Sequence, residues 1–263
     1  MLESATTPLL ELLAHFITSQ TILTLRELFQ RAQLSGLDLD RLQTVSALCR
    51  KHNLEFIPPL TRGDLDSPRK LRFRPATGLT HEAALEEIAK GESQTLEFKS
   101  SLWFDRQRAE SNPEVSLAEL KSELVLHSAL KSIAAMMNTS GGILYLGVRD
   151  DGRPIGLEPD YAFLKPEKRD PDGFELVFRD LIKDRFYRGN GVNDCIEVRF
   201  IVVGNGPCTI SRIEVVPGPQ LAFLRGVKDP HYHLYRRQGN RTTEVRIEEF
   251  EDFLLSRRRM YAA

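Results

Sequence analysis

The sequence predicts an α+β protein with a mixed or mostly antiparallel sheet, flanking helices and a small helical module in front. Apolar residues recur at helical spacing in several stretches, and short apolar or alternating runs between them predict strands. Gly-containing turns typical of hairpins join strands in the second half. Helices together with a mixed or mostly antiparallel set of strands indicate the α+β class. We expect the helical module over residues 1–80, the main domain over 81–258 and a tail over 259–263.

Composition sets the broad class. The 263 residues are 41% hydrophobic and 28% charged, which is typical of a globular protein with room for one large or two modest domains. The formal net charge is -1, so nucleic-acid binding would need a local basic patch. The three cysteines are far apart and have neither zinc nor disulfide spacing. Since the sequence has neither a basic leader nor an apolar run of about 18 residues, we expect a cytoplasmic protein without membrane contact.

The first module contains three helical stretches and two short strands. Residues 5–52 alternate at helical period, and strands are predicted over 54–57 and 70–73 around a polar loop. This is the outline of a winged helix. None of the helices is dense in Arg, Asn or Gln, as a helix that reads DNA would be, so a helical docking module is an equally good interpretation. A linker is predicted over 75–78.

The main domain is organised around one unit of helix, double glycine and strand. Residues 117–138 have the apolar stripe of a long helix. Gly141 and Gly142 then allow backbone conformations that a Cβ would penalise. The apolar run 143–148 predicts a buried strand, and Asp150-Asp151-Gly152 predicts a hairpin turn with two carboxylates at the strand's end.

The other elements follow from the same patterns. Leu96 and Phe98 alternate with Glu97 and Lys99, which predicts a strand with one charged face. The remaining predictions are helices over 82–90, 174–186 and 247–255, strands over 196–203, 208–216, 221–224 and 231–237, and charged loops over 105–116 and 163–172.

Four blocks in the main domain resemble the Schlafen Alba-type domain over roughly residues 88–256. Each block is weak alone, but all four occur in the family's order. The blocks are Glu92-x4-Glu97-Phe98-Lys99, Lys131-x-Ile133-Ala134-x3-Asn138-Thr139-x-Gly141-Gly142, Leu146-Gly147-Val148-x-Asp150-Asp151-Gly152-x2-Ile155-Gly156 and Tyr235-x-Arg237-x-Gly239-Asn240-x-Thr242.

The resemblance implies nucleic-acid binding and, by analogy with vertebrate Schlafens, metal-dependent cleavage of RNA. Those nucleases use two glutamates that match Glu92 and Glu97, and an aspartate near the end of the next strand. Asp150 would take that role, because Arg149 stands where the family's aspartate often follows Gly-Val. Such carboxylates suit Mg²⁺ or Mn²⁺, which can activate water and neutralise phosphate charge.

The spacing of the two glutamates sets a condition on this site. Residues five apart in one extended strand point to opposite faces, so Glu92 and Glu97 converge only if the chain bends between 91 and 95. The alternative is structural: Glu92 caps a turn, Glu97 pairs with Lys99 or Lys131, and the aspartates serve the hairpin. The order helix-Gly-Gly-strand is not that of a nucleotide-binding loop, so no ATP is expected.

Basic residues supply the other candidate contacts. Lys99, as a catalytic residue, and Lys131 are candidates for phosphate contact or transition-state stabilisation. On the strand from His231, alternate residues share one face, and a cationic face with aromatics could grip phosphates and stack on unpaired bases. The alternative is an edge strand kept soluble by charge. The residues of this predicted nucleic-acid-binding patch are His231, His233, Tyr235, Arg237, Asn240, Arg241 and Thr242.

The leading hypothesis is a nucleic-acid-binding protein, with RNA favoured and endoribonuclease activity as an extension. One alternative is a non-catalytic DNA-binding transcriptional regulator whose first module reads DNA. Another is a protein-interaction adaptor. Vertebrate Schlafens place two such lobes in one chain and this chain has one, so we expect a homodimer.

Overall fold

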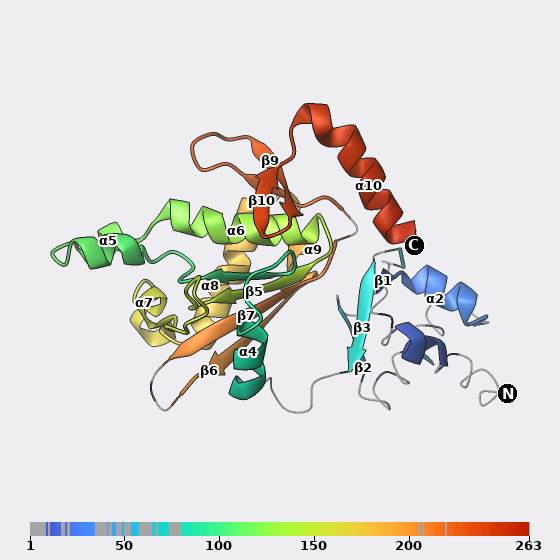
Figure 1. Cartoon of the computed structure of the whole chain (residues 1–263), viewed down its shortest axis with the longest axis horizontal. Coiled ribbons are helices and arrows are strands. Elements are labelled where there is room, and N and C mark those ends of the chain that lie inside the picture. The colour runs from blue at the N-terminus through green and yellow to red at the C-terminus, as the bar shows by residue number, and fades with distance from the viewer. Residues whose placement is uncertain are drawn as a thin grey trace.

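The protein contains a small N-terminal sheet with helices and a larger α+β domain (Figure 1). The computed structural model describes residues 9, 11–16, 19, 22–34, 41, 44–45, 49, 54–57, 65–66, 68–73 and 80–262, the last range without 205, 207 and 219. The predicted linker at 75–78 and most of the third predicted helix lie outside these residues. Among the helices that are described, none has the length and apolarity needed to cross a membrane.

The N-terminal part forms a three-stranded antiparallel sheet in the order β1-β3-β2. Both predicted strands are confirmed, as β2 (Leu54–Ile57) and β3 (Arg69–Phe73), while the two-residue β1 (Ile22–Leu23) has no sequence signal. Helix α2 (Leu25–Arg31) begins at Thr24, where Thr24 and Glu27 form a reciprocal capping box. Since residues 35–40 and most of 42–53 are not described, the winged helix stays a prediction.

The main domain contains a four-stranded mixed sheet and a three-stranded antiparallel sheet. The first has the order β4-β5-β7-β6, in which only the β4–β5 pair is parallel, so the predicted fold class is confirmed. Its strands are β4 (Leu96–Lys99), β5 (Gly142–Leu146), β6 (Ile196–Val202) and β7 (Thr209–Val215). The second has the order β10-β9-β8, with strands β8 (Phe223–Arg225), β9 (Tyr232–Gln238) and β10 (Arg241–Glu244).

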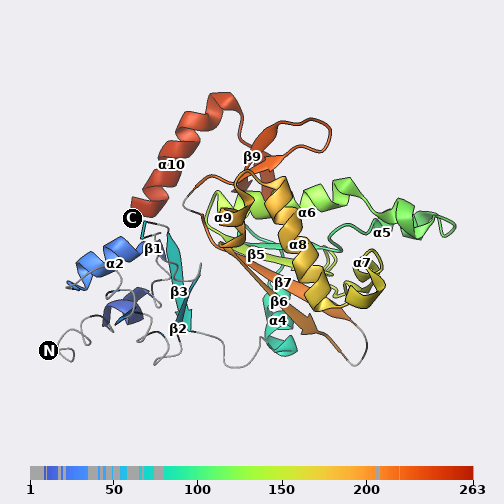
Figure 2. The ribbon, with the colours of Figure 1, turned by 180° about the vertical axis from the view of Figure 1, so that it is seen from behind.

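Helices cover both faces of the four-stranded sheet (Figures 1 and 2). Leu144 and Leu146 face α6 and α8, whereas Tyr145 faces α4 on the other side. The helices are α4 (His81–Ile88), α5 (Arg106–Ser111), α6 (Glu123–Met137), α7 (Glu158–Tyr161), α8 (Pro171–Arg185), α9 (Gly189–Asn193) and α10 (Phe250–Ala262). Short 3₁₀ turns occur at η1 (Leu117–Leu120), η2 (Pro166–Lys168) and η3 (Ile247–Glu249).

Two predictions about the chain before the central strand are wrong. The long helix begins after Ser122, whose side chain accepts from the N–H of Val125, and residues 117–120 form the separate turn η1. The segment predicted as a loop contains α5, where the Asp105 side chain accepts from the N–H of Arg108. In both cases a local cap determines where the helix begins.

Helix α6 lies between the two sheets. It contacts β5 and β7 on one side and β8, β9 and β10 on the other (Figure 1). Because both sides are covered, the helix is buried almost all round in its second half, at residues 129, 130 and 132–137.

The double glycine after α6 is required by close backbone contacts. Gly141 has φ +75, and a Cβ there would lie 2.6 Å from the Val215 oxygen. A Cβ on Gly142 would lie 2.7 Å from the Thr95 oxygen. The predicted helix-Gly-Gly-strand unit is therefore confirmed, and its glycines let β4 and β7 approach the end of α6.

The buried Asn138 ties the C-terminal end of α6 to the three-stranded sheet. Its Nδ2 donates to the carbonyl oxygens of Ala222 and Tyr235, each at 2.9 Å. Its Oδ1 accepts from the N–H of Ala222 at 2.8 Å. One amide thus satisfies three buried backbone groups, which a smaller side chain would leave without partners.

We expect Asn138→Ala to lower the free energy of unfolding by about 2–4 kcal/mol, because buried backbone groups lose their partners. Urea unfolding measures this, with Asn190→Ala as the exposed matched control in α9. Equal stabilities of the two variants would contradict the anchoring role of Asn138.

A second buried polar side chain, the carboxylate of Asp160, binds the loop after β4. Its Oδ1 accepts from the backbone N–H groups of Leu102, Trp103 and Phe104 at 2.9–3.2 Å. Burial raises the pKa of Asp160 to about 6, against the opposing effects of these N–H groups and of the Arg106 guanidinium.

This raised pKa gives a pH dependence of stability with a defined sign. The folded state holds the proton on Asp160 more tightly than the unfolded state, so the stabilisation is complete below about pH 4 and is lost as pH rises toward about 6. Between about pH 4 and 7 we expect wild type to lose up to about 3 kcal/mol of unfolding free energy relative to Asp160→Asn. Urea titrations of both proteins across this range measure the difference, and Asp172→Asn corrects for loss of one charge. If the unfolding free energy of wild type minus that of Asp160→Asn stays constant or rises with pH, the assignment is contradicted.

Candidate nucleic-acid interface

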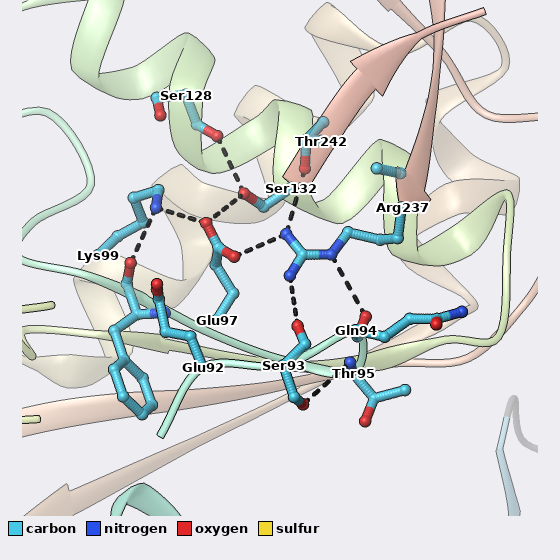
Figure 3. A network of polar contacts seen from close by, with 12 residues as sticks. Glu92, Ser93, Gln94, Thr95, Glu97, Lys99, Ser128, Ser132, Arg237 and Thr242 are labelled. Atoms are coloured by element: carbon cyan, nitrogen blue, oxygen red, sulfur yellow. Dashed lines mark hydrogen bonds and ion pairs between the residues drawn. The ribbon is translucent and has the colours of Figure 1, made fainter. Parts of the chain in front are cut away.

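A buried ion pair between Glu97 and Arg237 lies at the centre of the candidate site (Figure 3). Arg237 Nη1 donates to Glu97 Oε2 at 2.6 Å, and the arginine side chain is 0% exposed. The other oxygen, Glu97 Oε1, accepts from Lys99 Nζ at 2.6 Å and from Ser132 Oγ at 3.4 Å. Both carboxylate oxygens therefore have partners within the protein.

The guanidinium of Arg237 also holds the segment before β4. Its Nη2 donates to the Ser93 oxygen at 2.5 Å and its Nε to the Gln94 oxygen at 3.3 Å. Its Nη1 is also 3.3 Å from Thr242 Oγ1 on β10. The expectation that Arg237 lies on an exposed basic face is wrong, because these contacts point it inward against β4.

The chain before β4 bends as the convergence of the two glutamates requires. The N–H of Ser93 donates to the Leu96 oxygen at 2.8 Å, and Glu92 folds back along the strand. The N–H of Phe98 donates to Glu92 Oε1 at 2.8 Å. Because β4 is an edge strand, this carboxylate satisfies a backbone group that has no neighbouring strand.

Glu97 and Asp150 lie close enough to Glu92 for their charges to affect its pKa. Burial is the main cause of the raised pKa of Glu92, and the charges of Glu97 and Asp150 add to it, while the Phe98 N–H and Lys99 oppose it. Asp150 itself is exposed in the turn after β5. The structure thus brings the predicted carboxylates into one region.

These carboxylates do not fit a divalent ion as they are arranged. Across the described part of the chain, no group of three or more His, Cys, Asp or Glu side chains is placed to hold a metal. Glu97 is already bound by two cations, Arg237 and Lys99. We therefore derive no hydrolytic step through Mg²⁺ or Mn²⁺.

Lys131 lies on α6 beside this ion pair. It is partly exposed, and its Nζ lies 5.9 Å from the centroid of the Tyr235 ring. Tyr235 is buried, at 8% exposure, and its hydroxyl lies 3.4 Å from His127 Nε2. Tyr235 therefore supports Lys131 through a cation–π contact and does not offer its own face to a base.

The outer part of β9 is not the cationic face that the sequence predicts. His233 Nδ1 lies 2.7 Å from Glu244 Oε1, and its Nε2 lies 3.1 Å from Asp229 Oδ1. Glu244 is the main cause of the raised pKa of His233, and Asp229 contributes. The charge of this histidine is thus matched by two carboxylates.

Two cations are chain neighbours of residues that contact the central pair, Lys131 next to Ser132 and Arg241 next to Thr242. Among the described residues, neither Lys131 nor Arg241 has a carboxylate within ion-pair distance, and Arg241 and Asn240 are exposed at the turn between β9 and β10. We use the name junction surface for the residues that β4, α6 and the β9–β10 hairpin contribute here, namely Lys99, Lys131, Asn240, Arg241 and Thr242.

Ser132 and the cavity beside Asp150 were not predicted from the sequence. Ser132 is a buried polar residue in an apolar stretch of α6, and that position is the signal which could have found it. The cavity, of about 340 Å³, depends on α5, which the sequence did not predict. It is lined by Ser100, Arg106, Gln107, Glu110, Arg149, Asp150 and Asp151.

The fold and the site define an α+β domain with a buried polar network between a mixed sheet and a second, smaller sheet. The model of the Schlafen, AlbA_2 family matches residues 92–246, more than half of the chain, so the chain belongs to this family. Membership suggests a nucleic-acid-binding role.

One similar solved structure is the DIP2311 protein from Corynebacterium diphtheriae. The identity is 20% and the TM-score 0.41, over 67% of this chain and 31% of that chain. This chain therefore spans about a third of that protein's length. No curated protein matches the sequence.

We expect Arg237→Leu to lower the free energy of unfolding by about 3–5 kcal/mol, because it leaves Glu97 buried without its main partner. The double substitution Glu97→Leu with Arg237→Leu should recover part of this loss, since no buried charge is left over. Urea unfolding of the two single variants and the double variant measures the coupling.

The matched control is Arg108→Leu, which breaks the exposed pair with Glu119. Its effect should stay within about 1 kcal/mol. Equal losses for Arg108→Leu and Arg237→Leu would show that the central pair is no more important than a surface pair.

Proposed function

We propose that the protein binds single-stranded or folded RNA through the junction surface. The observation that carries the proposal is the convergence of three distant family-matched segments, β4, α6 and the β9–β10 hairpin, around two cations without carboxylate partners among the described residues. Lys131 and Arg241 suit phosphate contact, and the exposed amide of Asn240 suits a sugar or base edge.

RNA is favoured over duplex DNA because of the shape and charge of this surface. Its cations come from a helix and a hairpin turn, and Glu92 lies near Glu97 and Lys99 (Figure 3). No described element of the junction surface presents the row of polar side chains that reads a major groove. A flexible strand can place its phosphates at Lys131 and Arg241 and keep them away from the carboxylates.

Metal-dependent cleavage is the competing activity that the family resemblance predicts. The observation in its favour is that the charges of Glu97 and Asp150 help to raise the pKa of Glu92. The internal ion pairs of Glu97 stand against it, and binding without cleavage is therefore our first proposal.

The test is binding of the full chain to one labelled sequence as single-stranded RNA, single-stranded DNA and duplex DNA, by fluorescence anisotropy at several salt concentrations. We expect RNA to bind most tightly. Lys131→Ala and Arg241→Ala should each weaken RNA binding and lower the salt slope by about 0.7 per lost phosphate contact. Lys168→Ala, an exposed lysine in η2, is the matched control.

Four results would contradict the proposal in whole or in part. Absence of binding to any nucleic acid would refute the proposal. If Lys168→Ala weakened RNA binding as much as Lys131→Ala and Arg241→Ala, the junction surface would not be the binding site. Tightest binding to duplex DNA, retained by residues 1–80 alone, would favour the transcriptional regulator. RNA cleavage that requires Mn²⁺ or Mg²⁺ and disappears in Glu97→Gln would make the protein a nuclease. Light scattering of the same samples tests the predicted homodimer.

A further inference from the structure

Two exposed tyrosines form a pair on the surface beside β8. Tyr187 is 50% exposed and Tyr232 is 44% exposed. Their ring centroids are 5.9 Å apart with an interplanar angle of 68°, an edge-to-face contact. The other tyrosines with described side chains, Tyr145, Tyr161 and Tyr235, are buried. The two described tyrosines that are exposed to solvent thus lie next to each other, although 45 positions separate them in the sequence.

Rigid backbone holds both rings in place. The N–H of Tyr187 donates to the Phe223 oxygen at 3.0 Å, directly after a bridge between Phe186 and Leu224. Tyr232 is paired with Arg225 across the β8–β9 ladder. The pair is therefore held by backbone pairing, with Tyr187 beside the edge strand β8 and Tyr232 at the start of the central strand β9.

A cation in a strained conformation completes the group. The Cζ of Arg188 lies 5.3 Å from the centroid of the Tyr187 ring, and its Nη1 donates to Gln220 Oε1 at 3.1 Å. Arg188 has φ +54, a left-handed conformation that disfavours residues with a Cβ. Such strain is concentrated at functional positions. Within the described part of the chain, Arg188 has no carboxylate at ion-pair distance.

We propose that Tyr187, Tyr232 and Arg188 form a platform on which an unpaired base of RNA stacks while Arg188 contacts a phosphate. Exposed aromatic rings beside an unpaired cation match the two parts of a nucleotide, its base and its phosphate. This inference rests on the proposed RNA binding and adds a second contact region to it. Along β9, Tyr232 is five residues from Arg237, about 17 Å, and on the opposite face.

The test measures binding of the full chain to a labelled single-stranded RNA, the same strand with abasic positions, and a blunt RNA duplex. Tyr187→Ala and Tyr232→Ala should each weaken binding of the intact single strand by about 5- to 100-fold. Tyr232→Phe and Tyr232→Trp should bind like wild type, because they keep the ring. Leu176→Ala, an apolar residue of α8 that is 56% exposed, is the matched control and should change nothing.

The abasic strand separates stacking from other effects. Wild type should bind it more weakly than the intact strand, and Tyr232→Ala should cause no further loss. Arg188→Gln should lower the salt slope for the single strand by about 0.7. Circular dichroism of each variant checks that the fold is retained.

Retained RNA affinity in both Tyr→Ala variants would overturn the platform and leave the proposed function standing. Equal losses on intact and abasic strands would also overturn it, because the rings would then not act by stacking. Conversion of a dimer to a monomer with unchanged RNA affinity would identify a protein contact in its place. If wild type binds no nucleic acid at all, the proposed function is refuted, and the platform is refuted with it.

Discussion

The ion pair between Glu97 and Arg237 is the constraint on which the arrangement of the domain depends. It joins the edge strand of the mixed sheet to a strand 140 residues later. Burying two charges is unfavourable unless the remaining donors and acceptors are satisfied. Here the guanidinium also donates to the oxygens of Ser93 and Gln94, and the carboxylate also accepts from Lys99. The pair is stable because this network is complete, and the bend before β4 exists because the network holds it.

The two sheets are joined at a second point by an uncharged group. Asn138 at the end of α6 bonds the backbone of Ala222 and Tyr235. Tyr235 and Arg237 lie two residues apart on β9, so both anchors act on the same strand. Helix α6 is fixed between the sheets by these contacts, which sets the position of Lys131. The cation that we assign to RNA binding is therefore placed by buried polar bonds that no ligand touches.

The sequence predicted those elements whose signals are local. The double glycine after α6 and the alternation around Glu97 are determined by residues that are neighbours in the chain, and both predictions are confirmed. Strand β10 and helix α5 were missed, because each is short and contains too few apolar residues to show a strand or helix period. For the site, the family blocks identified residues that do meet in space. The alternation of side chains along a strand predicts the face of β9 on which Arg237 lies. It does not predict that β4 covers this face.

The same limit applies to the two tyrosines of β9. Tyr235 and Tyr232 lie on opposite faces of β9, and only packing against α6 determines which ring is buried. With a formal net charge of -1, long-range attraction of a polyanion is weak, and binding must come from a few well-placed groups. Base stacking does not depend on net charge, and it is tolerant of sequence because every base has a π-face. A nearly neutral protein that combines two or three phosphate contacts with an aromatic platform should therefore bind unpaired RNA with only a moderate dependence on salt.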